Sequence, residues 1–139
     1  MKLRILLQGK QFRICAEVNQ RGRCGVEESL NGLERAGGDG KSAVSRFRAQ
    51  MDVVANYGTR GQENSYFKRV AEGVWEFRCS GKARMLAWVI PDGRLLIIDV
   101  VLEDAKGGAG KLLKAKINEM KRKIGALISK YNSEEIEFE

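Results

Sequence analysis

Residues 73–102, GVWEFRCSGKARMLAWVIPDGRLLIIDVVL, decide the fold. Three apolar runs, 74–79, 84–90 and 95–102, are separated by Ser-Gly-Lys and Pro-Asp-Gly, which are typical turn sequences. The last run is apolar on both faces apart from Asp99, a pattern typical of a strand in the middle of a sheet. The stretch therefore predicts a three-stranded antiparallel meander with a central third strand.

Side chains in the first of these runs alternate with the period of two that a strand requires. Trp75 and Phe77 share one face, and Glu76 and Arg78 share the other. We expect the aromatic face to contact the core and the Glu76/Arg78 face to be wetter. Trp75 and Trp88 could stack on nucleic-acid bases, but tryptophan in short apolar strands more often packs in the core.

The elements on either side of the meander follow from the same patterns. Residues 3–7 and 12–18 predict a β-hairpin, and residues 26–36 predict a helix that ends at three glycines around Asp39. A second helix, capped by Asp39 or Ser42, runs to Tyr57-Gly58. The order ββ-αα-βββ-α predicts an α+β domain with helices packed on an antiparallel sheet.

A long helix is predicted beyond a glycine-rich hinge at residues 107–110. Its apolar stripe is Leu113, Ile117, Met120, Ile124, Leu127 and Tyr131. Its other faces carry lysine and arginine, which could line an RNA groove or simply face solvent.

Composition limits the function. The chain has 139 residues and no histidine, which excludes Ser-His-Asp catalysis and His-ligated zinc. The length suits one domain, which we place at residues 1–132, followed by an acidic tail at 133–139. Three cysteines without a CxxC pair are interpreted as buried thiols of a cytoplasmic protein. We expect no metal or organic cofactor, no signal peptide and no membrane span.

The net charge is +7, although four of the carboxylates lie in the last six residues. Such an excess attracts a polyanion such as RNA, DNA or a ribosome, or an acidic protein. Solubility is the simpler explanation of the same excess. A third alternative is that the acidic tail folds back over the cationic face and masks it.

Two segments imitate a phosphate-binding loop. Residues 35–42 end in Gly-Lys-Ser, but Arg35 stands where the first glycine belongs, and the segment follows a predicted helix instead of a strand. Residues 110–112 lack the Ser or Thr that would hold magnesium. Both segments are better explained as helix boundaries than as nucleotide sites.

Cations cluster around the first two strands of the meander: Lys68, Arg69, Arg78, Lys82 and Arg84. Because adjacent antiparallel strands bring such side chains together, Arg78, Lys82 and Arg84 could converge on a phosphate. The alternative is that these cations form surface ion pairs with Glu72 and Glu76. Asp99, within a buried strand, is expected to be paired with a cation or backbone amides, or to be functional.

The ordered set of motifs from residue 56 to about 124 resembles the RelE/ParE toxin superfamily, especially its HigB-like, phage-associated branch. The matching segments are Tyr57-Gly58, Lys68-Arg69-Val70, Gly73-Val74-Trp75-Glu76-Phe77-Arg78, Arg84-Met85-Leu86-Ala87-Trp88-Val89 and the apolar run at 95–102. About half of the chain is covered, and each motif is weakly specific by itself.

This resemblance implies a RelE-like fold and the toxin of a toxin–antitoxin pair, with a small helix-turn-helix protein as antitoxin. The best-known members enter the ribosome and cut mRNA by attack of a ribose 2′-OH on the adjacent phosphate; another branch poisons gyrase. By analogy Arg78 and Arg84 would clamp the phosphate and Asp99 would be a possible base. Lys68, Arg69 and Lys82 would bind RNA, with Tyr66 as a speculative proton donor.

The sequence departs from the family after the last strand. Many members have a His-Gly-Phe-like step and a lysine pair there, whereas this chain has Asp99, Glu103 and Asp104. Carboxylates at these positions would repel an RNA phosphate. A catalytically inactive, repurposed RelE-like module that binds a partner protein or nucleic acid is therefore the alternative function.

Overall fold

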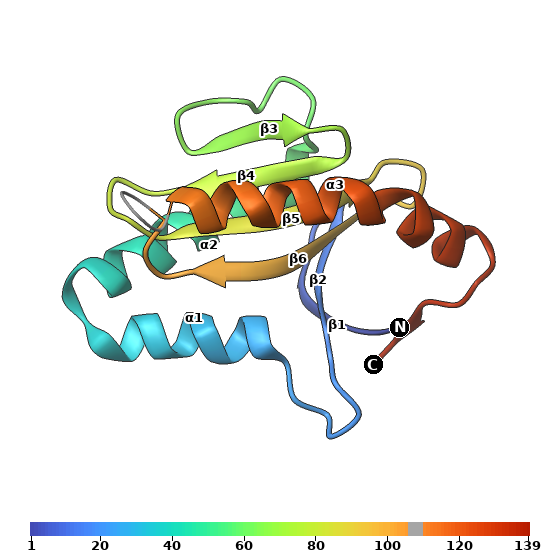
Figure 1. Ribbon diagram of the computed structural model, residues 1–139, viewed down its shortest axis with the longest axis horizontal. Helices are drawn as coiled ribbons and strands as arrows, with labels where there is room; N and C mark the ends of the chain where they lie inside the picture. Colours follow the sequence, from blue (N-terminus) through green and yellow to red (C-terminus); the bar gives the residue numbers. More distant parts are fainter. Residues whose placement is uncertain (106–109) are drawn as a thin grey trace.

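The computed structural model describes residues 1–105 and 110–139. One seven-stranded sheet, in the order β3-β4-β5-β6-β2-β1-β7, lies between helices on its two faces (Figure 1). The strands are β1 (Lys2–Gln8), β2 (Arg13–Glu17), β3 (Phe67–Ala71), β4 (Val74–Arg78), β5 (Arg84–Ile90), β6 (Leu95–Leu102) and β7 (Glu137–Phe138). The helices are α1 (Gly25–Ala36), α2 (Gly38–Tyr57) and α3 (Gly110–Asn132). The predicted α+β fold, with its N-terminal hairpin, two helices, antiparallel strands and long last helix, is confirmed.

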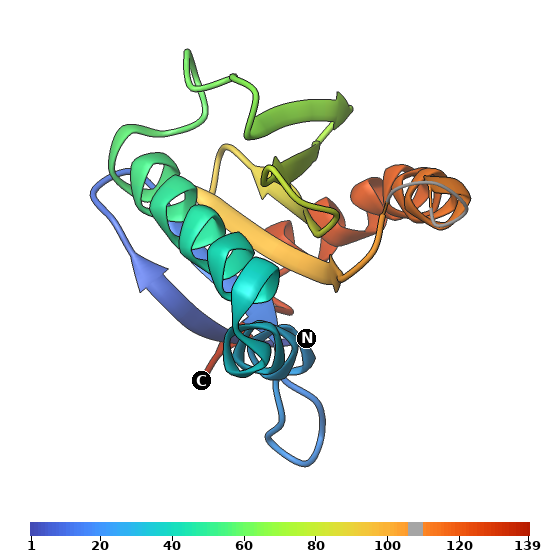
Figure 2. The ribbon, with the colours of Figure 1, turned by 90° about the vertical axis from the view of Figure 1, so that its left-hand side faces the viewer.

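Alternation along the strands divides the core into two layers. Met85 and Ile98 pack with α1 and α2 on one face, while Leu86 and Ile97 pack with α3 on the other (Figure 2). The predicted apolar stripe of α3 faces the sheet. The Trp88 indole N–H donates to the backbone oxygen of Met120, at 3.1 Å, and so ties α3 to β5.

The sheet is mixed, so the prediction of a purely antiparallel sheet is wrong at two places. β2 runs parallel to β6, and β1 runs parallel to β7. The hairpin β1–β2 and the strands β4 to β6 are antiparallel, as predicted. Periodicity identifies each strand but not its neighbour. Partners separated by more than 80 residues are chosen by packing of the whole core.

The meander contains a fourth strand, β3, which pairs with β4. Lys68 and Arg69 lie within β3, ahead of the three strands that the sequence predicts for the meander. Gly73, with φ +72°, makes the tight turn between the two strands. The sequence signal was weak because only Phe67 and Val70 are strongly apolar in this segment.

The helix α2 begins without the predicted side-chain cap. Gly37 alone separates α1 from α2, and its φ of +72° belongs to the left-handed region that suits glycine. Because one residue makes the corner, Asp39 and Ser42 already lie within α2 and do not cap it. The phosphate-loop-like segment at 35–42 is thus a helix–helix corner.

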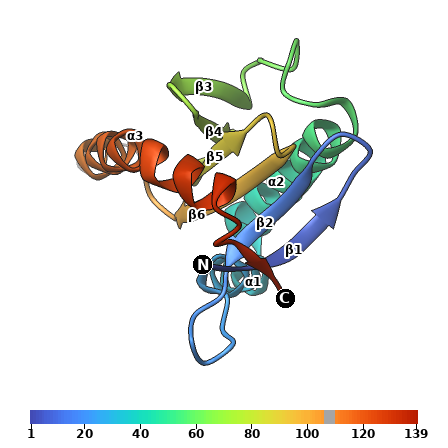
Figure 3. The same cartoon turned by 90° about the vertical axis from the view of Figure 1, so that its right-hand side faces the viewer.

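The acidic tail packs against the N-terminal hairpin, and the two ends of the chain lie close together (Figure 3). β7 pairs with Lys2 and Leu3 of β1. The guanidinium of Arg4 binds Glu139, with Nη2 3.0 Å from Oε1. These contacts hold the tail on β1, away from the β4–β5 turn.

Three further expectations concern burial and the hinge. All three cysteines are free and buried, and burial raises the pKa of the Cys15 thiol to about 11. Within residues 1–105 and 110–139, no helix has the length and apolar character needed to cross a membrane. The predicted hinge at 107–110 lies outside the described residues, except for Gly110, the first residue of α3.

Candidate functional site

Arg78 and Arg84 face each other where β4 ends and β5 begins. The two residues are direct partners in the antiparallel register, so their side chains leave the same face of the sheet. That face is the one covered by α3, because the neighbouring pair Val74 and Trp88 packs there. The predicted proximity of the two arginines is confirmed.

Arg84 is anchored by the turn that joins β4 to β5. Its Nη1 donates to the backbone oxygens of Gly81, at 2.8 Å, and Ala83, at 2.7 Å. Lys82 lies in the same turn with its side chain exposed. The turn thus presents one anchored and one exposed cation beside Arg78.

Arg78 is anchored by Glu76, two residues earlier on the same face. Its Nε donates to Oε1 of Glu76, whose side chain is only 1% exposed, while that of Arg78 is 34% exposed. The expectation that Glu76 lies on a wetter face is therefore wrong. The reason is α3, which covers this face and brings Ile124 against Gly73. Of the alternative prediction, surface ion pairs of these cations with Glu72 and Glu76, only the Arg78–Glu76 pair is found among the described residues, and its glutamate is buried.

Only some of the other predicted RNA-binding residues lie on the same face of the sheet as Arg78 and Arg84. The Arg78 backbone N–H donates to the backbone oxygen of Tyr66, at 2.8 Å, so the main chains of Tyr66 and Arg78 lie side by side. The Tyr66 ring, however, lies under the guanidinium of Arg46 from α2, 4.1 Å from its centroid. Lys68 is the register partner of Glu76 and shares its face. Arg69 is the next residue along β3 and points to the other face.

Asp99 lies elsewhere, at a β-bulge in β6. Leu102, three residues further on, is the register partner of Arg84, which places Asp99 about 10 Å along the strand from the arginines. Its Oδ2 is 3.1 Å from Nζ of Lys116 on α3. Burial disfavours the charged form of Lys116, but Asp99 and Glu119 outweigh this effect and raise the pKa of Lys116. The expected pairing of Asp99 with a cation is confirmed.

Two cavities adjoin the predicted residues. One, of about 310 Å³, is lined by Asp99, Glu17, Ser29 and the wall of β6. Its two carboxylates would disfavour a phosphate. The other, of about 430 Å³, lies between the β4–β5 turn and α2, with Lys82 and Glu103 on its wall. Neither cavity is lined by Arg78 or Arg84, which are half-buried on the face of the sheet that α3 covers.

The structure adds two residues that the sequence did not indicate: Arg46 over Tyr66, and Lys116 on Asp99. Glu76 was expected as an ion-pair partner, because a glutamate two residues before an arginine on one strand shares its face, but its burial was not expected. Among residues 1–105 and 110–139, no cluster of Cys, Asp or Glu could hold a metal ion.

No protein family, curated protein or solved structure matches this chain in comparison. The resemblance to the RelE/ParE superfamily therefore remains a prediction from sequence motifs. The function has to be argued from the geometry of the site.

Proposed function

We propose that this chain is the toxin of a toxin–antitoxin pair and cuts mRNA on the ribosome. The observation that carries the proposal is the Arg78–Arg84 pair on a protein of net charge +7. Two guanidinium groups on adjacent strands match the charge and geometry of a phosphodiester. Its partners would be the ribosome with its mRNA, and a small helix-turn-helix antitoxin.

In the proposed reaction, a ribose 2′-OH attacks the adjacent phosphate. Arg78 and Arg84 would stabilise the charge that develops on the phosphate oxygens. Lys68 and Lys82 would hold the RNA backbone beside the two arginines, and Arg69 would contact RNA only where it passes the edge strand β3 to the opposite face. Tyr66 would donate a proton to the leaving oxygen once its ring leaves the Arg46 guanidinium. Asp99, expected as a possible base, lies about 10 Å along β6 from the two arginines and is paired with Lys116, so it is out of reach of a 2′-OH beside a phosphate held there. Solvent water would take the 2′-OH proton instead.

The test is a reconstituted translation reaction in which new 5′ ends on the message are mapped after adding the purified chain. We expect cuts inside the reading frame on ribosome-bound message and none on the same RNA alone. Arg84→Ala should abolish the cuts. Arg21→Ala, which removes the same charge from the loop between β2 and α1, should leave them unchanged. Cleavage by Arg84→Ala at the wild-type rate would remove this site from the proposal.

A second candidate is a non-catalytic module that binds a partner protein or nucleic acid. The Asp99–Lys116 ion pair favours it, because the carboxylate expected as a base is occupied by a lysine of α3. Acidic Glu103 and Asp104 after β6 favour it as well. Folded protein that binds ribosomes or RNA without producing any cut would support this candidate over the nuclease.

A further inference from the structure

Glu76 is an unusual residue in this sheet. Within the described residues, only Glu76 and Gln50 are polar side chains classed as buried, and Glu76 is the charged one. A carboxylate under a helix is costly unless a cation compensates its charge. Arg78 supplies that cation through an ion pair, and Lys68 is the cross-strand neighbour of Glu76.

The contact between Glu76 and Arg78 uses one particular nitrogen. Nε of Arg78 donates to the carboxylate, and within the described residues the guanidinium makes no other side-chain hydrogen bond. A guanidinium has five N–H donors in a rigid plane, so fixing Nε also fixes the direction of Nη1 and Nη2. The other four N–H groups of Arg78 are thereby oriented, and they make no hydrogen bond to any residue at 1–105 or 110–139.

Arg84 is held in a complementary way. Its Nη1 is occupied by two turn carbonyls, which leaves Nε and Nη2 available among the described contacts. Directly opposed like charges destabilise a strand pair. The negative charge of Glu76, two residues along the same face from Arg78, offsets that repulsion and lets the two guanidinium groups lie together.

We propose that Glu76 is a positioning residue that aims the terminal nitrogens of Arg78, together with Arg84, at a single phosphodiester group of RNA. The choice of RNA rests on the proposed function; the orientation of Arg78 by Glu76 does not. Glu76 itself does not contact the ligand, because it is buried beneath Arg78 and α3.

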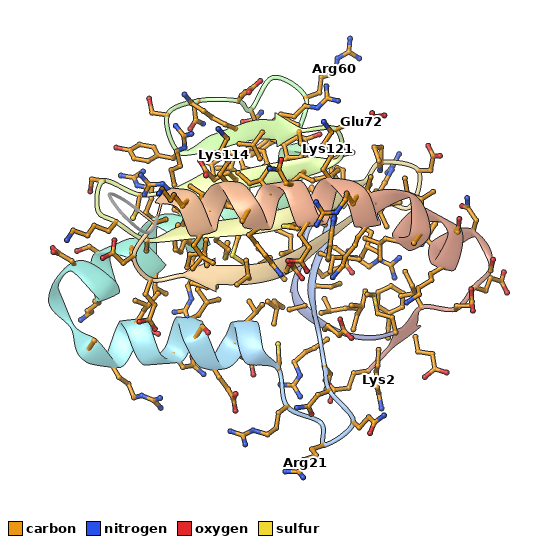
Figure 4. All side chains as sticks on the ribbon, in the orientation of Figure 1. Lys2, Arg21, Arg60, Glu72, Lys114 and Lys121 are labelled. Atoms are coloured by element: carbon orange, nitrogen blue, oxygen red, sulfur yellow. The ribbon has the colours of Figure 1, made fainter. Side chains whose placement is uncertain are left out.

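The sharpest test uses the sign of an affinity change. The probe is a short single-stranded RNA, which should stay intact without a ribosome, and binding to the full chain is followed by fluorescence anisotropy at low salt. Removing a negative charge from a basic protein should tighten RNA binding. We expect this for Glu72→Gln, an exposed glutamate at the β3–β4 turn (Figure 4). Glu76→Gln should instead weaken binding, by about tenfold. Tighter binding by Glu76→Gln would overturn the proposal.

A double-mutant cycle separates positioning from general damage to the fold. In the Arg78→Ala background, Glu76→Gln should cause no further loss of affinity, whereas a structural role would cause the same loss in both backgrounds. Equal losses in both backgrounds would contradict the proposal. Urea unfolding of each variant confirms that folded protein is being compared.

A measurement without RNA tests the orientation alone. In the folded chain, the Arg78 Nε–H should give an NMR signal that exchanges slowly with water, assigned by its absence in Arg78→Ala. In the Glu76→Ala variant, the Arg78 Nε–H should exchange with water as fast as the Nε–H of the exposed Arg21. Fast exchange in the wild type would refute the positioning role. Slow exchange and a coupled affinity loss without any ribosome-dependent cleavage would retain the positioning role and reject the nuclease.

Discussion

At the scale of single residues, ionic contacts fix which cations remain available. Arg4 donates from all three of its guanidinium nitrogens, to the carboxylates of Glu139 and Glu27 and to the Gly22 backbone oxygen. Arg78 and Arg84 are each anchored through one nitrogen and keep the others. The difference between a structural and a ligand-binding arginine is therefore the number of N–H groups that the fold itself consumes.

The Arg4–Glu139 contact gives a prediction about acidification. The hydrogen bond and charge of Arg4 hold the pKa of Glu139 below its ordinary value of 4.5. A carboxylate with a lowered pKa stabilises the folded tail above its unfolded-state pKa, and this contribution disappears as the pH falls through the folded-state pKa. A carbon-detected NMR titration should place the Glu139 midpoint below 4.5, and Arg4→Ala should raise it. An unchanged midpoint in Arg4→Ala would show that the tail is not held by this pair.

At the scale of elements, α3 is the element on which the site depends, because it buries the face that holds Glu76 and Arg78. Met120 is fully buried between α3 and the sheet, and its neighbour Lys121 is exposed (Figure 4). Met120→Ala should lower the free energy of unfolding by about 3 kcal/mol, because a cavity replaces its side chain. Lys121→Ala should change it by less than about 0.5 kcal/mol. Urea unfolding followed by tryptophan fluorescence measures both; equal effects would mean that α3 is not packed as described.

The elements also divide what sequence could predict from what it could not. The strands β4 to β6 and the stripe on α3 were predictable, since their apolar residues follow a single period. The parallel neighbours β2 and β6 were not, because pairing between distant segments depends on the assembled core. The same limit applies to the site: register brought Arg78 to Arg84 as expected, but the burial of Glu76 required knowing that α3 covers that face.

At the scale of the whole molecule, the net charge is +7, but the cations in some regions already have partners within the protein. Near the hairpin, Arg4 pairs with Glu139, and Arg13 lies over the Phe138 ring at 4.1 Å. The acidic tail thus occupies cations at one end of the sheet. The β4–β5 turn at the other end keeps Lys82 exposed beside the two arginines. We therefore expect RNA to bind at this turn, because local and not total charge decides where a polyanion is held.

Comparison of Lys82→Ala with Arg21→Ala tests this expectation, since both remove one exposed positive charge and Arg21 lies in the loop after β2 (Figure 4). Each phosphate contact with single-stranded RNA contributes about 0.7 to the slope of log affinity against log salt concentration. Lys82→Ala should reduce that slope by about 0.7, whereas Arg21→Ala should leave it unchanged. Anisotropy titrations over a series of salt concentrations give both slopes. If the slope of log affinity against log salt concentration falls by the same amount in both variants, RNA responds to the overall charge of the protein, and the β4–β5 turn is not its binding site.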